Sequence, residues 1–210
     1  MMKSCVLLFA VFFTFSITAQ NFKYDEEDLE FYFEKIVPVS ISKDSVLELS
    51  KEWFALNFND SNKVIKLTTD DKIIGKASSK INIVSGSASV PATMEYSILV
   101  SFKENKYRFQ VVDIYIDTGI AKNLLYDYHQ GLNFDYYEQT IAASKENTTD
   151  KNALKAIDKM LSNDKMMQQT FEVARQANQN MMDQALDNCI RLEQSFYTTV
   201  TGQTKENDDW

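Results

Sequence analysis

Apolar and polar side chains alternate with a period of two along three segments in the first half of the chain. In residues 73–83 the odd positions hold isoleucine or small residues, and most even positions are polar. Residues 94–103 and 106–116 alternate in the same way, except that the alternation slips at 111–112. A period of two is typical of a strand with one buried face. The pattern predicts three strands, the last two joined as a hairpin, with a bulge before Ile114.

A helical pattern lies between two shorter predicted strands. Residues 31–37 and 64–69 are rich in aromatic and β-branched side chains, which favour strands. Between them, residues 43–58 carry apolar side chains at intervals of three or four, Trp53 among them, and this spacing predicts a helix with a broad buried face. Small residues on the buried face of 73–83 leave room for a bulky element. We expect the face of Trp53 to pack there.

After about residue 150 the apolar residues recur at helical spacing, which predicts two helices, 150–161 and 164–199. The second carries an apolar stripe with one skipped turn at Asn178, and it would span ~50 Å. A sheet of about five strands does not easily cover that length. The other covers are the first helix folded back, a bend near Asn178, or a second copy of the chain. We expect self-association through one part of the stripe, made of Met182, Ala185, Cys189, Leu192 and Phe196.

The segment that connects the two halves, residues 121–149, shows neither pattern, and we expect irregular structure or a short strand there. It is rich in tyrosine, a side chain with a flat apolar face and a polar tip that suits glycans and protein partners. Packing across the sheet is the alternative interpretation. The candidate binding surface consists of Tyr126, Tyr128, Tyr136 and Tyr137.

The first residues have the layout of a secretory signal peptide. Lys3 precedes an apolar run of about a dozen residues, which ends in small residues at Thr18 and Ala19. This run is short of the ~20 residues that a membrane span needs, and no second run of that length follows. We therefore expect cleavage after Ala19 and a protein without a membrane span, located in the periplasm or secreted.

The charge of the exported chain limits the classes of partner it can bind, and its cysteine content limits its disulfides. Loss of residues 1–19 removes one of the 22 Lys and Arg residues and none of the 30 acidic ones, so the net charge becomes −9. Such a surface repels nucleic acid and anionic headgroups. Cys5 would leave with the signal peptide, so Cys189 alone remains and no internal disulfide can form. We expect no nucleic-acid partner.

No set of residues with catalytic or metal-binding spacing stands out. His129 is the one histidine, so a histidine-rich metal site would need more than this chain offers, and a lone histidine beside tyrosines is usually hydrogen-bonded or exposed rather than catalytic. The five glycines are scattered and form no phosphate-binding loop. Asp113 and Asp117 share a face but lack a third ligand. We expect no cofactor, no metal and no enzymatic activity.

Three segments together resemble a known family. They are residues 50–58, 64–67 and 70–76, in which Trp53 and Phe54 fall in the first segment and Gly75 and Lys76 in the last. Their order and spacing resemble the family called domain of unknown function 4468 with a TBP-like fold, over about residues 31–115. The hairpin at 94–112 also matches. Ala77 stands where members often have glycine. We interpret Trp53, Phe54 and Gly75 as structural and Lys76 as facing outward.

The resemblance implies a curved antiparallel sheet packed by a helix, and no assigned activity. A fold class of α+β follows, with a TBP-like sheet of about five strands and then a C-terminal helical hairpin or long helix. The expected organisation is a signal peptide (1–19), an acidic lead-in (20–30), the TBP-like domain (31–120), the tyrosine-rich connecting segment (121–149), a helical region (150–200) and a flexible tail (201–210).

The leading functional hypothesis is a non-enzymatic binding or interaction module of the bacterial envelope, with an unidentified protein or glycan as partner. One alternative is an enzyme that acts on envelope lipid or glycan through a site not visible in the sequence. Another is a structural homo-oligomer held by the C-terminal helix. Carboxylate pairs for acid–base catalysis cannot be selected among 30 acidic residues by spacing alone, so the enzymatic alternative stays open.

Overall fold

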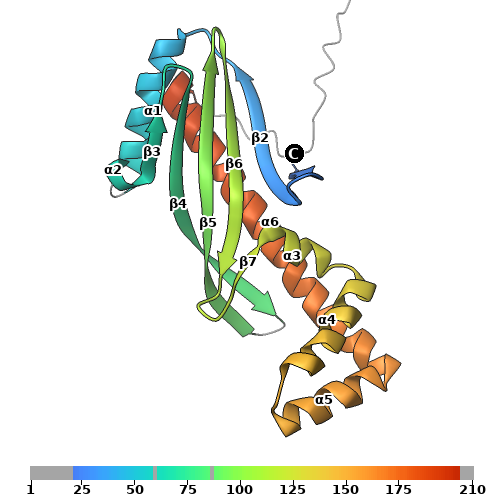
Figure 1. The fold of residues 1–210 in the computed structure, drawn as a ribbon. Coiled ribbons are helices and arrows are strands. Elements are labelled where there is room, and N and C mark those ends of the chain that lie inside the picture. The colour runs from blue at the N-terminus through green and yellow to red at the C-terminus, as the bar shows by residue number, and fades with distance from the viewer. Residues whose placement is uncertain (1–20, 59–60, 86–87, 204–210) are drawn as a thin grey trace, which may run out of the picture.

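A computed structural model describes residues 21–58, 61–85 and 88–203 of the 210-residue chain. The predicted signal peptide and most of the predicted tail lie outside the described residues. The described part is α+β, with an antiparallel sheet followed by helices and ending in one long helix (Figure 1). This is the predicted fold class.

Seven strands form the sheet of the described residues, all in antiparallel pairs. Their order is β1-β2-β6-β5-β4-β3, and β7 pairs with β6. Long alternating segments form the centre, as predicted. The bounds are β1 Lys23–Asp25, β2 Glu30–Pro38, β3 Ile65–Thr68, β4 Lys72–Ser85, β5 Ala88–Lys103, β6 Lys106–Asp117 and β7 Lys122–Leu124.

Two helices pack on one face of the sheet, and shorter helices lie beyond its end. The helices are α1 Lys43–Asn57, α2 Ser61–Val64, α3 Leu125–Gln130, α4 Phe134–Asn147, α5 Lys151–Leu161 and α6 Asp164–Thr201. The C-terminal half of α6 runs along the sheet beside α1 (Figure 1). Its N-terminal half continues past the sheet, where α3, α4 and α5 pack against it.

Trp53 lies at the centre of the core, as predicted. Its side chain is 0% exposed, and its ring meets that of Phe196 edge-on with centroids 5.3 Å apart. Phe109 of β6 approaches the same indole, with centroids 6.0 Å apart. The indole Nε1–H donates a 3.0 Å hydrogen bond to Ser195 Oγ of α6. The side chain of Trp53, which belongs to α1, thus contacts both the sheet and α6.

Gly75 allows α1 to approach β4 closely, as the small residues on the buried face of 73–83 predicted. A Cβ atom at this position would collide with the ring of Phe54, to whose Cε1 atom it would lie closest. Phe54 is fully buried, and it neighbours Trp53 in α1. The role of Gly75 is therefore to let α1 approach the sheet. Trp53, Phe54 and Gly75 occupy structural positions, as interpreted from the sequence.

The predicted bulge is present in β6. Val112 pairs with Ser97 and Tyr115 with Glu95, so one extra residue of β6 lies opposite β5. Asp113 takes a left-handed conformation there, with φ of 52°. Its carboxylate accepts a 2.7 Å hydrogen bond from Ser97 Oγ, and this bond helps to hold the strained residue.

The prediction of irregular structure or a short strand for 121–149 was wrong for most of the segment. After the short β7, it folds into α3 and α4. Asn133 caps α4 by accepting a 3.1 Å hydrogen bond from the N–H of Tyr136. The acidic lead-in also contains more order than expected, because β1 pairs with β2 there.

The premise of the predicted self-association surface was also wrong. The structure buries most of that surface inside one chain, where the C-terminal half of α6 packs on the sheet. The N-terminal half is covered by α3, α4 and α5, so α6 continues through Asn178 unbroken for 38 residues. The predicted residues that become buried in this way are Met182, Ala185, Cys189 and Phe196, while Leu192 is partly buried against the same core.

Candidate functional site

A hollow of about 470 Å³ lies between α3, α4 and α6, and three of the four predicted tyrosines line it. Tyr128 comes from α3, while Tyr136 and Tyr137 come from the first turn of α4. Asn178 of α6 closes another side. We call this hollow the tyrosine pocket. The helices missed in the sequence analysis are the elements that bring its residues together.

Local contacts fix the tyrosine rings at the pocket. Asn133 starts α4 as its cap, which places Tyr136 and Tyr137 side by side on the first turn. The ring of Tyr137 packs on Phe171 of α6, with centroids 5.6 Å apart. Tyr136 is 37% exposed, so part of its side chain is open to solvent. One ring is thus anchored and its neighbour is accessible.

Gly131 and Asn178 bring α6 close to the end of α3. Gly131 is buried, and a Cβ atom there would collide with the side-chain amide of Asn178. Asn178 is the residue at which the apolar stripe of α6 skips a turn. The skipped turn therefore marks the place where a polar side chain meets a glycine and lines the tyrosine pocket.

Polar groups lie among the tyrosines. Asn123, Asp127 and Thr140 contribute an amide, a carboxylate and a hydroxyl to the lining. Asp127 Oδ2 accepts a 3.1 Å hydrogen bond from the N–H of Leu124, which orients the carboxylate. Burial raises the pKa of Tyr128 above its ordinary value, although a hydrogen bond with Asn123 opposes the rise, so its hydroxyl is a neutral donor and acceptor. The pocket therefore combines flat apolar rings with oriented donors and acceptors.

The fourth predicted tyrosine lies elsewhere. Tyr126 stacks on Tyr24 with ring centroids 5.7 Å apart and planes 9° from parallel. It also faces Phe31 of β2, and His129 packs on the same phenylalanine with centroids 4.7 Å apart. The structure thus divides the predicted surface into the tyrosine pocket and a separate aromatic cluster beside β1.

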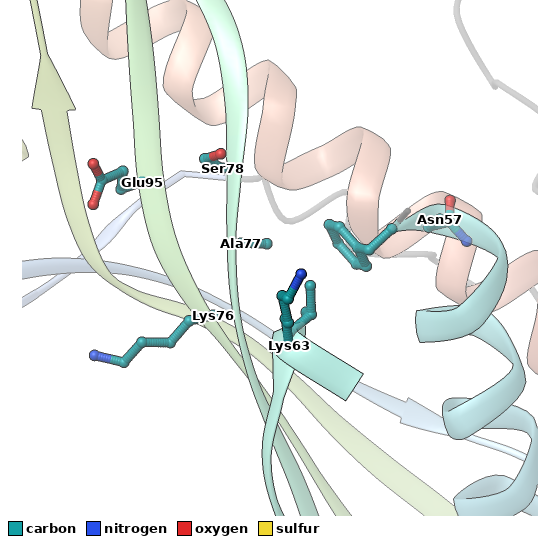
Figure 2. Close-up of a pocket in the computed structure, with 8 residues that line it drawn as sticks. Asn57, Lys63, Lys76, Ala77, Ser78 and Glu95 are labelled. Carbon is teal, nitrogen blue, oxygen red and sulfur yellow. The ribbon is translucent and has the colours of Figure 1, made fainter. Parts of the chain in front are cut away.

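A second hollow, which the sequence analysis missed, runs along the outer edge of β4. Figure 2 shows this groove of about 550 Å³, with Ala77 and Ser78 on the strand itself. Lys76 and Glu95 lie on one side of β4 in that view, and Asn57 and Lys63 lie on the other. We call it the edge groove. Lys76 faces outward as expected, and its position in this groove gives it a surrounding that no sequence pattern indicated.

Amide side chains of α6 take the place of a neighbouring strand at one end of β4. Gln184 Oε1 accepts a 3.1 Å hydrogen bond from the N–H of Asn82, and its Nε2 donates to the C=O of the same residue. Asn180, one turn earlier, accepts a 3.4 Å hydrogen bond from the N–H of Val84. These groups satisfy part of an edge that would otherwise be open.

The described residues contain neither a cluster of metal ligands nor a helix that could span a membrane. No group of three or more His, Cys, Asp or Glu side chains that could hold a metal ion occurs among them. Within the same residues, no helix is both long enough and apolar enough to cross a membrane.

Comparisons with known proteins agree on the fold and family. Residues 32–117 match the model of the family described as a domain of unknown function (DUF4468) with TBP-like fold. A search of curated proteins found no match. A crystal structure of a DUF4468 family protein from Bacteroides ovatus has 11% identity and a TM-score of 0.56, over 84% of this chain and 90% of that chain.

A second solved structure is a TBP-like protein from Parabacteroides distasonis, with 13% identity, a TM-score of 0.38, and coverage of 72% of this chain and 94% of that one. The likeness to the Bacteroides ovatus structure shows a shared fold over more of the chain than the family match alone. It says nothing of activity. Residues 32–117, from β2 to the end of β6, thus form a domain of the DUF4468 family with a TBP-like fold.

Proposed function

We propose that this chain is an exported, non-enzymatic binding protein of the bacterial envelope, and that the tyrosine pocket holds a carbohydrate ligand. The observation that carries the proposal is the meeting of Tyr128, Tyr136 and Tyr137 in one hollow with oriented polar groups. Its volume of about 470 Å³ falls within the ~300–1,000 Å³ of small-molecule sites.

The chemistry of the tyrosine pocket suits a sugar ring. One face of a pyranose carries C–H groups that pack against an aromatic ring, and the exposed ring of Tyr136 offers such a surface. The hydroxyls at the ring edge need both donors and acceptors. Asn123 and Asn178 supply both kinds, and Asp127 supplies an acceptor.

Two features of the chain support the remaining parts of the proposal. The apolar run after Lys3 supports export, and its test is the intact mass of the protein recovered from the periplasm or the medium. Loss of residues 1–19 is the expected result, and retention of Met1 would contradict it. The non-enzymatic part is supported by the position of His129, the one histidine of the chain. It lies exposed against Phe31 and does not line the tyrosine pocket.

A direct test is a titration of the mature chain with oligosaccharides released from envelope polysaccharides, followed by NMR of the tyrosine side chains. Tyr136→Ala should weaken binding by about two- to tenfold, because an aromatic stacking contact contributes about 0.5–1.5 kcal/mol. Tyr136 is exposed, so the substitution should leave the fold intact.

Tyr126→Ala provides the matched control, because Tyr126 belongs to the same tyrosine-rich segment but lies in the aromatic cluster beside β1. We expect its affinity to match that of the parent chain. Equal affinities in all three proteins would show that the ligand binds elsewhere. Failure of every oligosaccharide to perturb the tyrosine signals would contradict the carbohydrate assignment.

A further inference from the structure

Among the residues that the structure describes, the outer edge of β4 is covered at both ends and open in the middle. At one end β3 pairs with Ile73, Ile74 and Gly75. At the other end the amides of α6 bond to the main chain of Asn82 and Val84. Between these two covers the strand runs past the edge groove (Figure 2).

Hydrogen-bond parity shows which main-chain groups of this open stretch face outward. In an antiparallel pair, alternate residues direct their N–H and C=O groups toward the same neighbour. Asn82 and Val84 bond outward to α6, and the register with β5 is continuous from Lys72 to Ser85. Pro91, which lacks an N–H, lies opposite Asn82, as this parity requires. Ser78 and Lys80 therefore also face outward.

Ser78 and Lys80 lack outward main-chain partners in the described part of the chain. None of the hydrogen bonds there engages their outward N–H or C=O groups, although both side chains are exposed. These groups are spaced as an incoming strand requires. Main-chain bonds to such an edge are the basis of recognition by strand addition.

The side chains around the open stretch define the kind of strand that fits. Phe58 and Val64 give one wall of the edge groove an apolar surface. Lys76 is exposed, and the described residues offer it no ion pair. Glu95, the acidic residue of the lining, is held by Lys122 in a 2.6 Å ion pair. The groove therefore favours a strand with alternating apolar and acidic side chains.

We propose that the edge groove receives an extended acidic peptide segment of a partner protein, which pairs with Ser78 and Lys80 as an added strand in line with β3. A second copy of the same edge does not fit this chemistry, because it would bring Lys76 and Lys80 against their own counterparts. Lysines on an edge oppose such self-pairing. The proposal is independent of the tyrosine pocket, which lies on other elements.

The test uses a synthetic peptide of about eight residues with alternating valine and glutamate, long enough to span the open stretch at about 3.3 Å per residue. Amide hydrogen exchange is measured residue by residue on the mature chain. On binding, exchange at Ser78 and Lys80 should slow by about tenfold or more, because their N–H groups become bonded. Ala77 and Ser79 face β5, so their exchange should change little.

Two changes separate strand addition from simple charge attraction. Ser78→Pro removes the outward N–H without breaking a bond to β5, and it should abolish binding, while Ser78→Ala should bind as the parent does. A peptide with N-methyl groups on alternate residues keeps its charge but cannot donate those bonds, so it should not bind. Equal binding by Ser78→Pro or by the N-methylated peptide would overturn the proposal. Absence of binding at millimolar peptide would also overturn it.

Discussion

The two halves of α6 have different surroundings. The part from Met181 onward packs on the sheet and contributes eight of the ten buried residues of the helix, namely Met181, Met182, Ala185, Asn188, Cys189, Glu193, Phe196 and Val200. The part before Met181 contributes Met167 and Phe171, and its neighbours α4 and α5 contribute no buried residue. One continuous helix thus joins a deep core to a thin helical layer.

This difference shows where the molecule can hold a ligand. A close-packed core leaves little room for a cavity, whereas a layer with few buried side chains leaves hollows between its helices. The tyrosine pocket lies in the thin layer, between α3, α4 and the N-terminal half of α6. We expect this layer to open more readily than the core, because local stability follows the number of buried apolar contacts.

The largest expected effect is in the core. Trp53→Ala removes a fully buried indole that contacts Phe109 and Phe196, and it should lower the free energy of unfolding by about 3–5 kcal/mol. Denaturant titration measures the change. Since domains are stable by roughly 5–15 kcal/mol, such a loss would leave this one marginal. An unchanged denaturation midpoint would show that Trp53 contributes little to stability, and the core would then not differ from the thin layer in this respect.

A smaller loss, confined to one region, is expected in the thin layer. Phe171→Ala removes the ring on which Phe134 and Tyr137 pack, and it should cost about 2 kcal/mol, because an exposed layer can partly collapse around the gap. Amide exchange should accelerate in α4 and α5 and stay slow in β5 and β6. Equal acceleration in both regions would show that α6 couples them into one cooperative unit.

At the edge of β4 the expected effect is smaller again. Gln184→Ala removes the side chain that bonds to both main-chain groups of Asn82, and it should lower the free energy of unfolding by about 0.5–1.5 kcal/mol. Gln176→Ala, an exposed position on the same helix, should change it by less. If the free energy of unfolding falls by the same amount in both variants, the hydrogen bonds from Gln184 to the edge of β4 do not stabilise the protein.

The smallest effect concerns Glu30, beside the bulge of β6. Burial raises the pKa of Glu30, and the Asp113 carboxylate adds to the rise, although the N–H of Asp113 opposes it. The unfolded chain therefore releases this proton at lower pH than the folded chain, and stability falls as pH rises through that window. Glu30→Gln keeps an acceptor for Asp113 and should raise the melting temperature slightly at neutral pH, with no gain in acid. Exposed Glu27→Gln serves as the control, and a lower melting temperature for Glu30→Gln would contradict the argument.

Sequence patterns predicted the core region well because its elements are long and periodic. The alternation of 73–83, 94–103 and 106–116 corresponds to β4, β5 and β6, and the spacing around Trp53 corresponds to α1. Within the thin layer, the helix 150–161 was predicted and corresponds to α5, whereas α4 was missed because it buries no residue and no apolar stripe marks it as a helix. Its tyrosines also have a lower helix propensity than alanine or leucine, which favoured the wrong interpretation.

The two hollows were harder to predict than the elements. Three of the pocket tyrosines were selected from their residue type, but Asn123, Asp127 and Asn178 meet them only through the packing of α3 and α4 on α6. The edge groove combines the ends of α1 and α2 with the middle of β4. No local pattern encodes such a meeting of distant segments. The length of the last predicted helix also favoured a wrong interpretation. The part of α6 that extends past the sheet is covered by α3, α4 and α5 of the same chain.

The position of α6 after the sheet in the chain has a consequence for the order of folding. The bond between Trp53 and Ser195 joins residues 142 positions apart, and the bonds between Asn82 and Gln184 span 102 positions. During synthesis the sheet can form its hairpins early, but its apolar face stays uncovered until α6 has been synthesised and packs on it. Contacts of such long range slow folding, because the chain must order a large loop before it gains them. Folding of the domain is therefore completed only when α6 has been synthesised and docks on the sheet.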